Sequence, residues 1–370
     1  MKMDVNLRDK FYGCICGSHI GSAMGAVVEG APYTETEEKY GTLDKLLPYE
    51  HYDNGWLCEA GTTEDGIERQ KMISTAIIEK NDRVTAEDVR NIWLRDMNPL
   101  APGNVSEPFE ATLLAMAKAG MPAKDIGRYC DYANLITFAR ACHPIGLINA
   151  GDEKAAIADV MEVGQLYQAT NSRGLKWACV TAVAIAAATK PHATVDSVIQ
   201  AIFDHCNERQ VVAGREGWYP KWAGLDIAEE IENGLKATKN CKNFREIRVA
   251  FDKIYFAYGI PYSQAFANEI VTKGICVFKM VGGDVKEAMI AAVNLGRDTD
   301  CAAAVAAGIS GALSGTETLP KEWIEQVDYA TMLNPYTNSK RTMRENADGL
   351  YNAYANRLGK ARKLAEYMGI

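Results

Sequence analysis

The stretch that decides the expected fold is Asn294-Leu-Gly-Arg-Asp-Thr-Asp-Cys301, continued by Ala302-Ala-Ala-Val-Ala-Ala-Gly-Ile-Ser-Gly-Ala-Leu313. The run of small and apolar residues predicts a buried helix that its neighbours pack closely. Asp298 and Asp300 lie in the turn that opens this helix. One side-chain oxygen is enough to cap a helix, so the second carboxylate can serve another partner, such as a hard divalent cation. This stretch alone leaves helix capping and metal binding both open.

A second acidic cluster, Gly61-Thr-Thr-Glu-Asp-Gly66, opens another predicted helix over residues 66–80. Thr62 and Thr63 are available to cap it, and again a cap requires only one acidic side chain. Two doubly acidic helix starts, far apart in the sequence, are hard to explain by capping twice. The pair therefore favours a shared metal site.

The first predicted helix covers residues 7–26 and contains small residues at every third or fourth position. So many glycines lower helix propensity, and we expect another segment to approach this helix closely. Glu29 follows the helix directly. Its side chain either stays in solvent or projects toward the Asp298 cluster, and both interpretations remain open.

Helical periodicity continues through most of the remaining chain, and no series of segments alternates as a sheet would. The sequence predicts an all-α fold in a single domain. Residues 31–61 are expected to form a surface loop, and a break is expected at His143-Pro144. Further helices are expected over residues 86–97, 108–119, 123–130, 155–170, 174–189, 195–206, 225–237, 244–256, 263–280 and 284–293.

Composition restricts the partners and the compartment. A net charge of −8 without a long basic run argues against a nucleic-acid surface. The ten cysteines form no C-x-x-C pair, so we expect buried reduced thiols. The polar beginning of the sequence does not resemble a signal peptide, and the longest apolar runs, such as residues 178–189, are too short to span a bilayer. We expect a cytoplasmic protein without a membrane partner.

Four segments together resemble the ADP-ribosylglycohydrolase family, which includes the dinitrogenase reductase-activating glycohydrolase. Gly25-Ala-Val-Val-Glu-Gly30 resembles the end of the family's opening glycine-rich segment, and Thr63-Glu-Asp-Gly66 resembles its T-D-D-T motif. Phe138-Ala-Arg-Ala-Cys-His-Pro-Ile-Gly146 resembles its A-M-R-x-x-P-x-G segment, and Ala291-Ala-Val-Asn-Leu-Gly-Arg-Asp-Thr-Asp300 resembles its A-V-N-x-G-G-D-x-D motif. The four segments occur in the same order as in the family, and four matches in the right order are hard to obtain by chance.

The resemblance implies an all-helical domain that holds two Mg²⁺ ions, with Mn²⁺ as the alternative metal. It implies hydrolysis of an N- or O-ribosyl linkage in a small riboside or an ADP-ribosylated substrate. Hard cations prefer carboxylate and hydroxyl oxygens, which these motifs supply. Bound to ribose hydroxyls, the ions would orient the sugar and activate water. The implied metal ligands are Thr63, Glu64, Asp65, Asp298 and Asp300, and the implied catalytic residues are Glu29, Glu64 and Asp298.

Several positions differ from the family motifs. Glu64 stands in place of Asp, Gly66 in place of the closing Thr, Cys301 in place of Thr, and Ser22 in place of the opening Asp. These differences predict a changed substrate specificity. A non-catalytic relative that binds ribosides, or serves structurally, is the alternative function. Arg140 is expected, like His143, to support its loop rather than to act in catalysis.

Two further segments carry predictions about contacts. Trp218 and Tyr219 belong to an aromatic loop that either stacks on the substrate or packs on its own domain, and Asn294 is a third expected substrate contact. Residues 335–370 are expected to form a helical extension after a domain of residues 7–334. Its apolar stripe must be covered by the protein's own body or by another subunit. We expect a homo-oligomer assembled through this helix.

Overall fold

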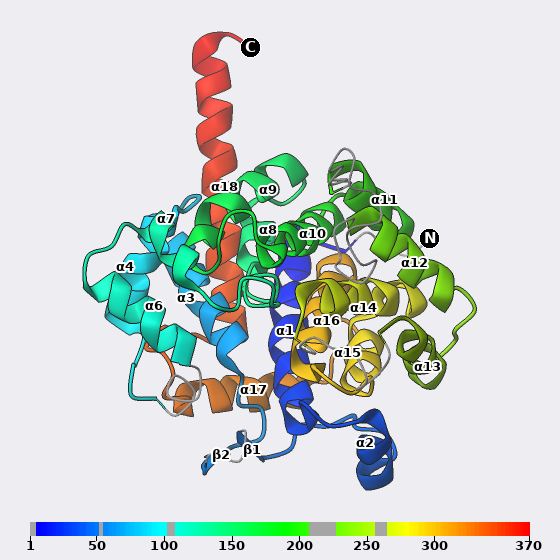
Figure 1. Ribbon diagram of the computed structural model, residues 1–370. Coiled ribbons are helices and arrows are strands. Elements are labelled where there is room, and N and C mark those ends of the chain that lie inside the picture. Colours follow the sequence, from blue (N-terminus) through cyan, green and yellow to red (C-terminus); the bar gives the residue numbers. More distant parts are fainter. Residues whose placement is uncertain (1–4, 52–54, 102–107, 207–226, 256–264) are drawn as a thin grey trace, which may run out of the picture.

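The computed structural model describes residues 5–51, 55–101, 108–206, 227–255 and 265–370, and most of this part of the chain is helical (Figure 1). The all-α fold expected from the sequence is confirmed. In chain order the helices are α1 (Leu7–Gly25), η1 (Ala26–Val28), α2 (Tyr33–Tyr40), α3 (Asp65–Lys80), α4 (Ala86–Asp96), α6 (Pro108–Lys118), α7 (Ala123–Ile126), η2 (Gly127–Tyr129), α8 (His143–Ile148), α9 (Glu153–Val163), η3 (Gly164–Leu166), α10 (Arg173–Ala188), α11 (Val195–His205), α12 (Ile227–Thr238), α13 (Phe244–Tyr255), α14 (Ala267–Met280), α15 (Val285–Val293), α16 (Thr299–Ser314), α17 (Lys321–Leu333) and α18 (Met343–Met368).

Helices α1 and α16 pack against each other at the centre of the protein, in opposite directions (Figure 1). Glycines of α1 allow this approach: a Cβ atom at Gly17 would lie 2.2 Å from the carbonyl oxygen of Ala307. A Cβ atom at Gly25 would lie 2.5 Å from the backbone of Asp300. The close neighbour expected from the glycine spacing is therefore α16. This packing brings the C-terminal end of α1 to the first turn of α16, where the acidic residues lie.

The other helices surround this central pair. Helices α14 and α15 pack on α16, with α12 and α13 outside them, whereas α3, α8 and the first half of α18 lie on the α1 side (Figure 1). Large side chains such as Trp177, Tyr167 and Phe138 are fully buried between these layers. Each such side chain contributes about 1.5–3 kcal/mol to the free energy of unfolding. The site-bearing ends of α3 and α16 are thus attached to a well-packed core.

Two local expectations need correction, and a third becomes more specific. Residues 31–61 are not a plain loop, because they include α2 and two short antiparallel strands, β1 (Tyr49–His51) and β2 (Trp56–Cys58). Strands of three residues are too short to show a sequence period. The helix expected over 155–170 ends at Val163 and continues as the short 3₁₀ helix η3. The break at His143-Pro144 is the start of α8, where Pro144 stands in the first turn and loses no helical hydrogen bond.

One apolar helical segment, Leu7–Val28, has the length and composition to cross a membrane, judged over the described part of the chain. The expectation from the sequence concerned uninterrupted apolar runs. This segment reaches the length and composition of a span because its charged residues are few, although its apolar run is interrupted. Its apolar window is 94% buried inside the protein. It is the core helix α1, and its burial accounts for its composition.

The last helix, α18, changes its environment halfway along. Thr342 and Glu345 form a capping box at its start, and Met343, Ala347 and Leu350 are buried against the body. The second half projects away from the body (Figure 1, red). There, apolar side chains are exposed, including Tyr367 at 86% and Met368 at 64%. Self-docking thus covers only the first half of the stripe.

Candidate metal centre and active site

The first acidic cluster is built by the turn that precedes α16. Asp298 is the N-cap residue, and its Oδ1 accepts a hydrogen bond from the Cys301 backbone N–H at 3.3 Å. Thr299 donates its hydroxyl hydrogen to the Gly25 carbonyl at 2.8 Å, which ties the turn to α1. Asp298 therefore does cap the helix. Because the cap uses only one of its oxygens, capping and metal binding are compatible.

The turn contains an unusual backbone conformation at Arg297, whose side chain is held in a buried ion pair. Arg297 has φ 70°, a left-handed conformation that a residue with a side chain adopts at a cost of order 1–3 kcal/mol. Its guanidinium contacts Glu269 of α14 at 2.7 and 2.9 Å, and both side chains are buried. The Arg297 backbone also pairs with Gly30 and Ala31, at 2.8 and 3.0 Å. The loop that carries Glu29 is therefore fastened beside the acidic turn.

The second acidic cluster begins α3. Glu64 has the backbone of an N-cap residue but makes no side-chain cap, and its Oε1 instead accepts the Tyr49 hydroxyl hydrogen at 2.7 Å. Asp65 occupies the first turn, and its Oδ2 pairs with Arg69 at 2.7 Å. Both carboxylates are buried, Glu64 at 3% and Asp65 at 7% exposure. The cap that a simple structural role would require is absent, since no side-chain cap bond begins α3.

Thr63, the expected hydroxyl ligand, makes other contacts. Its Oγ1 donates to Glu68 Oε1 at 2.6 Å and accepts from Lys71 Nζ at 3.1 Å. Lys71 and Glu68 form a fully buried ion pair at 2.7 Å, which Asn334 joins by donating to Glu68 at 3.1 Å. The Thr63 hydroxyl thus belongs to a buried polar network below the acidic cluster.

Arg140 joins the two acidic helix starts. Its Nη2 donates to both carboxylate oxygens of Asp65 at 2.6 Å, and its Nη1 donates to Asp300 Oδ2 at 3.1 Å. The same Nη1 lies 2.8 Å from Cys301 Sγ. The side chain is only 12% exposed. The two clusters therefore do converge, with a guanidinium between them.

Gln70 and His143 hold the segment that carries Arg140 in position. Gln70 donates from Nε2 to the Arg140 carbonyl at 2.7 Å and approaches His143 Nδ1 at 3.1 Å. His143 Nε2 lies 3.0 Å from the Ala304 carbonyl, so the neutral ring with hydrogen on Nε2 satisfies both contacts. His143 supports the loop, as expected, whereas Arg140 lies in the site itself. Arg140 is the one permanently charged residue of the motif at 138–146, which was the sequence signal for it.

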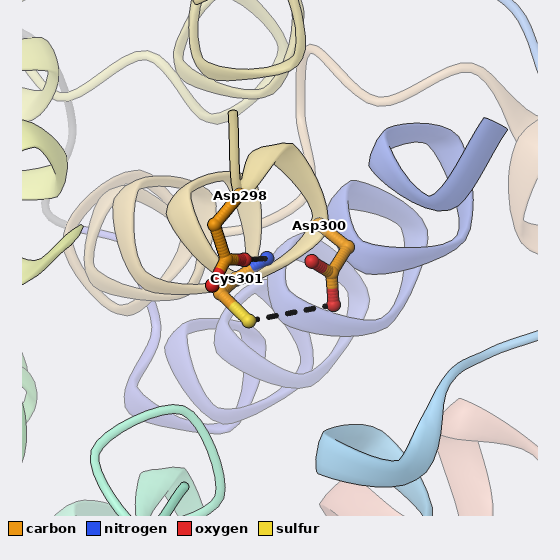
Figure 2. A group of neighbouring side chains, drawn as sticks. All are labelled: Asp298, Asp300 and Cys301. Carbon is orange, nitrogen blue, oxygen red and sulfur yellow. Dashed lines mark hydrogen bonds between the residues drawn. The ribbon is translucent and has the colours of Figure 1, made fainter. Parts of the chain in front are cut away.

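Asp298, Asp300 and Cys301 form a group that could hold a metal ion, found among the residues that the structure describes (Figure 2). One ligand atom of each lies within 4.8 Å of the others, and all three residues are buried. Among the described residues, no hydrogen-bond donor reaches Asp300 Oδ1. A buried carboxylate oxygen without a partner is costly, and a cation is the partner that a second carboxylate and a thiol would share with it. These residues fit a divalent cation.

The electrostatics of this group agree with that fit. Burial raises the pKa of the Asp298 carboxyl well above its usual range, and the neighbouring Asp300 carboxylate raises it further. Burial also raises the pKa of the Cys301 thiol well above its ordinary value. Both shifts reflect the cost of negative charge in this place. A cation would remove that cost.

The remaining predicted site residues divide into three cases. Glu29 is partly buried near Cys301, and its charge contributes to the raised pKa of that thiol. Asn294 is buried and uses its amide on the backbone of Leu43, accepting at 3.0 Å and donating at 2.9 Å. It thereby anchors the segment after α2. Trp218 and Tyr219 lie outside the described residues.

Comparison with known proteins agrees with this architecture. A family model described as ADP-ribosylglycohydrolase matches residues 3–359. An uncharacterized protein of Archaeoglobus fulgidus is 22% identical over 329 residues, which cover 86% of this chain and 92% of that protein. A solved structure titled "ADP-ribosylglycohydrolase-related protein complex" has a TM-score of 0.61 at 17% identity, covering 94% of this chain and 99% of the other. That likeness concerns the fold.

The family match supports a function of the glycohydrolase type. The chain belongs to the ADP-ribosylglycohydrolase family, since the family model spans nearly its whole length.

Proposed function

We propose that the protein is a divalent-metal-dependent hydrolase that cleaves an N- or O-ribosyl linkage at the anomeric carbon of ribose. The observation that carries this proposal is the buried group of Asp298, Asp300 and Cys301, in which Asp300 Oδ1 has no hydrogen-bond donor among the described residues. Family membership supports the glycohydrolase type of reaction. The substrate class is a small riboside or an ADP-ribosylated molecule.

In this proposal Asp298 and Asp300 hold the cation, with Mg²⁺ or Mn²⁺ as the metal. When bound, the cation polarises ribose hydroxyls and lowers the pKa of a nearby water. Cleavage passes through an oxocarbenium-like state, whose positive charge the carboxylates of the site stabilise. Glu29 orients the attacking water, since it is partly exposed while the other acids are buried. Glu64, fixed by the Tyr49 hydroxyl, borders the sugar from the α3 side.

Further substrate contacts are proposed from the sequence. Trp218 and Tyr219 would stack on a base or on the leaving group, because aromatic rings in a loop are suited to planar partners. Asn294 contributes indirectly, by holding Leu43. Nucleic acid and membranes are not partners in this proposal. We also propose a cytoplasmic location, which the ten free cysteine thiols support.

The test is hydrolysis of defined ribosides by metal-stripped protein, with and without added Mg²⁺ or Mn²⁺. N-linked and O-linked ADP-ribosides and a simple nucleoside are incubated, and the released sugar is measured by chromatography. We expect metal-dependent release that Asp298→Asn abolishes. Asp284→Asn is the matched control, because Asp284 caps α15 by the same type of hydrogen bond at 2.9 Å. Riboside binding without any release would favour the non-catalytic relative.

A further inference from the structure

We infer that this metal centre takes one divalent cation rather than two, because the guanidinium of Arg140 fills the place of the second. The inference rests on the metal dependence proposed above. The two-ion centre implied by the family resemblance requires the carboxylates of both helix starts. In this chain a positively charged group already lies between the two helix starts, namely the guanidinium of Arg140.

The contacts of Arg140 are those of a bridging cation. Both carboxylate oxygens of Asp65 accept hydrogen bonds from Arg140 Nη2 at 2.6 Å. Asp65 Oδ2 also forms an ion pair with Arg69 at 2.7 Å. Nη1 reaches across to Asp300 Oδ2 at 3.1 Å and to Cys301 Sγ at 2.8 Å. Nη2 is shared between the two carboxylate oxygens, and buried hydrogen bonds of this charge-assisted kind are shorter and stronger than neutral ones. Asp65 is therefore committed to guanidinium groups rather than to an ion.

The charges of the cluster bear on the same number. Glu29, Glu64, Asp65, Asp298 and Asp300 carry five negative charges when ionised. The two guanidinium groups that pair with Asp65, those of Arg140 and Arg69, carry two positive charges. Three negative charges remain, so a second dication would leave one positive charge in excess, which is unfavourable in a low dielectric. Without the Arg140 charge four negative charges remain, the number that two divalent ions balance.

Gly66 provides the room for Arg140. A Cβ atom at position 66 would lie 2.4 Å from both Cδ and Nε of Arg140. The T-D-D-T motif that this segment resembles ends in Thr, so the departure at Gly66 is the change that lets the arginine lie across the first turn of α3. Gln70, one turn further along α3, holds the Arg140 carbonyl at 2.7 Å. Two positions of α3 thus seat the same side chain.

The remaining ion site is the α16 group. Asp298, Asp300 and Cys301 lie at the first turn of α16, and Figure 2 shows their side chains grouped together, with a hydrogen bond from Cys301 Sγ to the Asp300 carboxylate. Asp300 has a divided role: Oδ2 accepts from Arg140, while Oδ1 is buried without a hydrogen-bond donor in the described structure. Oδ1 is thus the oxygen available to the single ion.

The experiment counts ions without measuring activity. Full-length protein is equilibrated with Mn²⁺ by dialysis, the bound metal is measured per chain, and low-temperature EPR separates isolated ions from spin-coupled pairs. We expect one Mn²⁺ per chain with an isolated-ion spectrum in the natural protein. Arg140→Gln removes the guanidinium from between the two helix starts and should bind two, with a coupled spectrum. Gly66→Ala, which displaces the arginine while keeping it in the chain, should also raise the number toward two.

Arg83→Gln is the matched control, because Arg83 pairs with the buried carboxylate of Asp159 away from the site. It should leave the count at one. Two Mn²⁺ ions per natural chain, or none, would overturn the inference, and so would a count of one in both Arg140→Gln and Gly66→Ala. If Arg140→Gln does not fold, the natural protein and Gly66→Ala decide the result. One bound ion with no hydrolysis of any riboside would contradict the proposed function and leave the single-ion inference standing.

Discussion

Asp298 performs two tasks at the start of α16, and its surroundings make them separable. One oxygen caps the helix by accepting from the Cys301 N–H, whereas the negative charge itself is unfavourable because the carboxyl is buried beside Asp300. An asparagine at this position keeps a capping oxygen and removes the charge. The substitution therefore isolates the metal-binding task.

We expect Asp298→Asn to retain the stability of the metal-free protein and to lose the stabilisation that Mn²⁺ provides. At a hundredfold excess of free ion over its Kd, that stabilisation amounts to about 2.7 kcal/mol in the natural protein. Asp298→Ala should in addition lose about 1 kcal/mol through the missing cap. Melting temperatures with and without Mn²⁺ measure both effects. An undiminished Mn²⁺ effect in Asp298→Asn would remove Asp298 from the ligand set.

His143 makes stability depend on pH. Burial lowers the pKa of its ring to about 4, from an ordinary value of 6.5. The unfolded chain therefore binds more protons between these values, so stability rises with pH across this window and is lost as the pH falls through it. The shift corresponds to at most roughly 3 kcal/mol. Denaturant unfolding between about pH 4 and 6.5 should show a smaller pH dependence for His143→Gln than for the natural protein. Equal slopes would contradict this assignment.

At the scale of elements, the contact between α1 and α16 determines where the site is. The helices approach so closely at Gly17 and Gly25 that a side chain has no room. The same approach joins Thr299 to the Gly25 carbonyl at 2.8 Å. A displaced α16 would therefore move Asp298 and Asp300 away from Arg140. The glycines of α1 accordingly serve the site through the packing of the helix that carries it.

We expect Gly17→Ala to destabilise the protein by about 1–3 kcal/mol, because the added Cβ would lie 2.2 Å from the Ala307 carbonyl oxygen. Gly359→Ala is the matched control, since Gly359 lies within α18 with no atom within 4 Å of its added Cβ. There the higher helix propensity of alanine should stabilise by up to about 1 kcal/mol. Denaturant unfolding of both variants measures the difference. A stabilising Gly17→Ala would show that the two helices can separate without cost.

The order of elements was predictable to the extent that each had a local pattern. The long amphipathic or apolar helices, such as α3 and α10, follow from periodicity and caps, since both signals lie within the segment itself. The short elements between residues 31 and 61 could not be predicted in this way. Helix α2 and the β1–β2 hairpin are shorter than the window over which a hydrophobic period is visible. Their existence depends on the body against which they lie.

At the scale of the whole molecule, the end of α18 projects from the body with apolar side chains exposed. Leu364, Tyr367 and Met368 are exposed there, at helical spacing. Residues 355–370 contain four basic residues and one acidic residue, whereas the whole chain carries −8. A second copy of this chain offers both an equivalent apolar helix and an acidic body. We therefore propose a homo-oligomer in which this half of α18 contacts another subunit.

Deletion of residues 361–370 should reduce the mass in solution to that of one chain and change the monomer's stability by no more than about 0.5 kcal/mol. The cut preserves the pair between Lys360 and Asp82 and the hydrogen bonds of Arg357 to the α8 end. Light scattering and a melting curve measure the two effects. Tyr367→Glu is a gentler companion, which should weaken association by placing a charge in the apolar contact. A natural protein that is monomeric at all concentrations would exclude this assembly.

The sequence by itself determined the helical class, the two acidic helix starts and the need for close packing at the first helix, because these follow from spacing within short segments. Only the tertiary structure decided which partners those side chains take. Arg140 lies 75 positions from Asp65 and 160 from Asp300, and it reaches both only because α3 and α16 are packed on the same core. Likewise, the Thr63 hydroxyl forms hydrogen bonds with Glu68 and Lys71, because folding buries their carboxylate and ammonium groups beside it. A side chain's partner depends on which groups folding brings within about 3 Å, and that distance is not encoded in any local pattern.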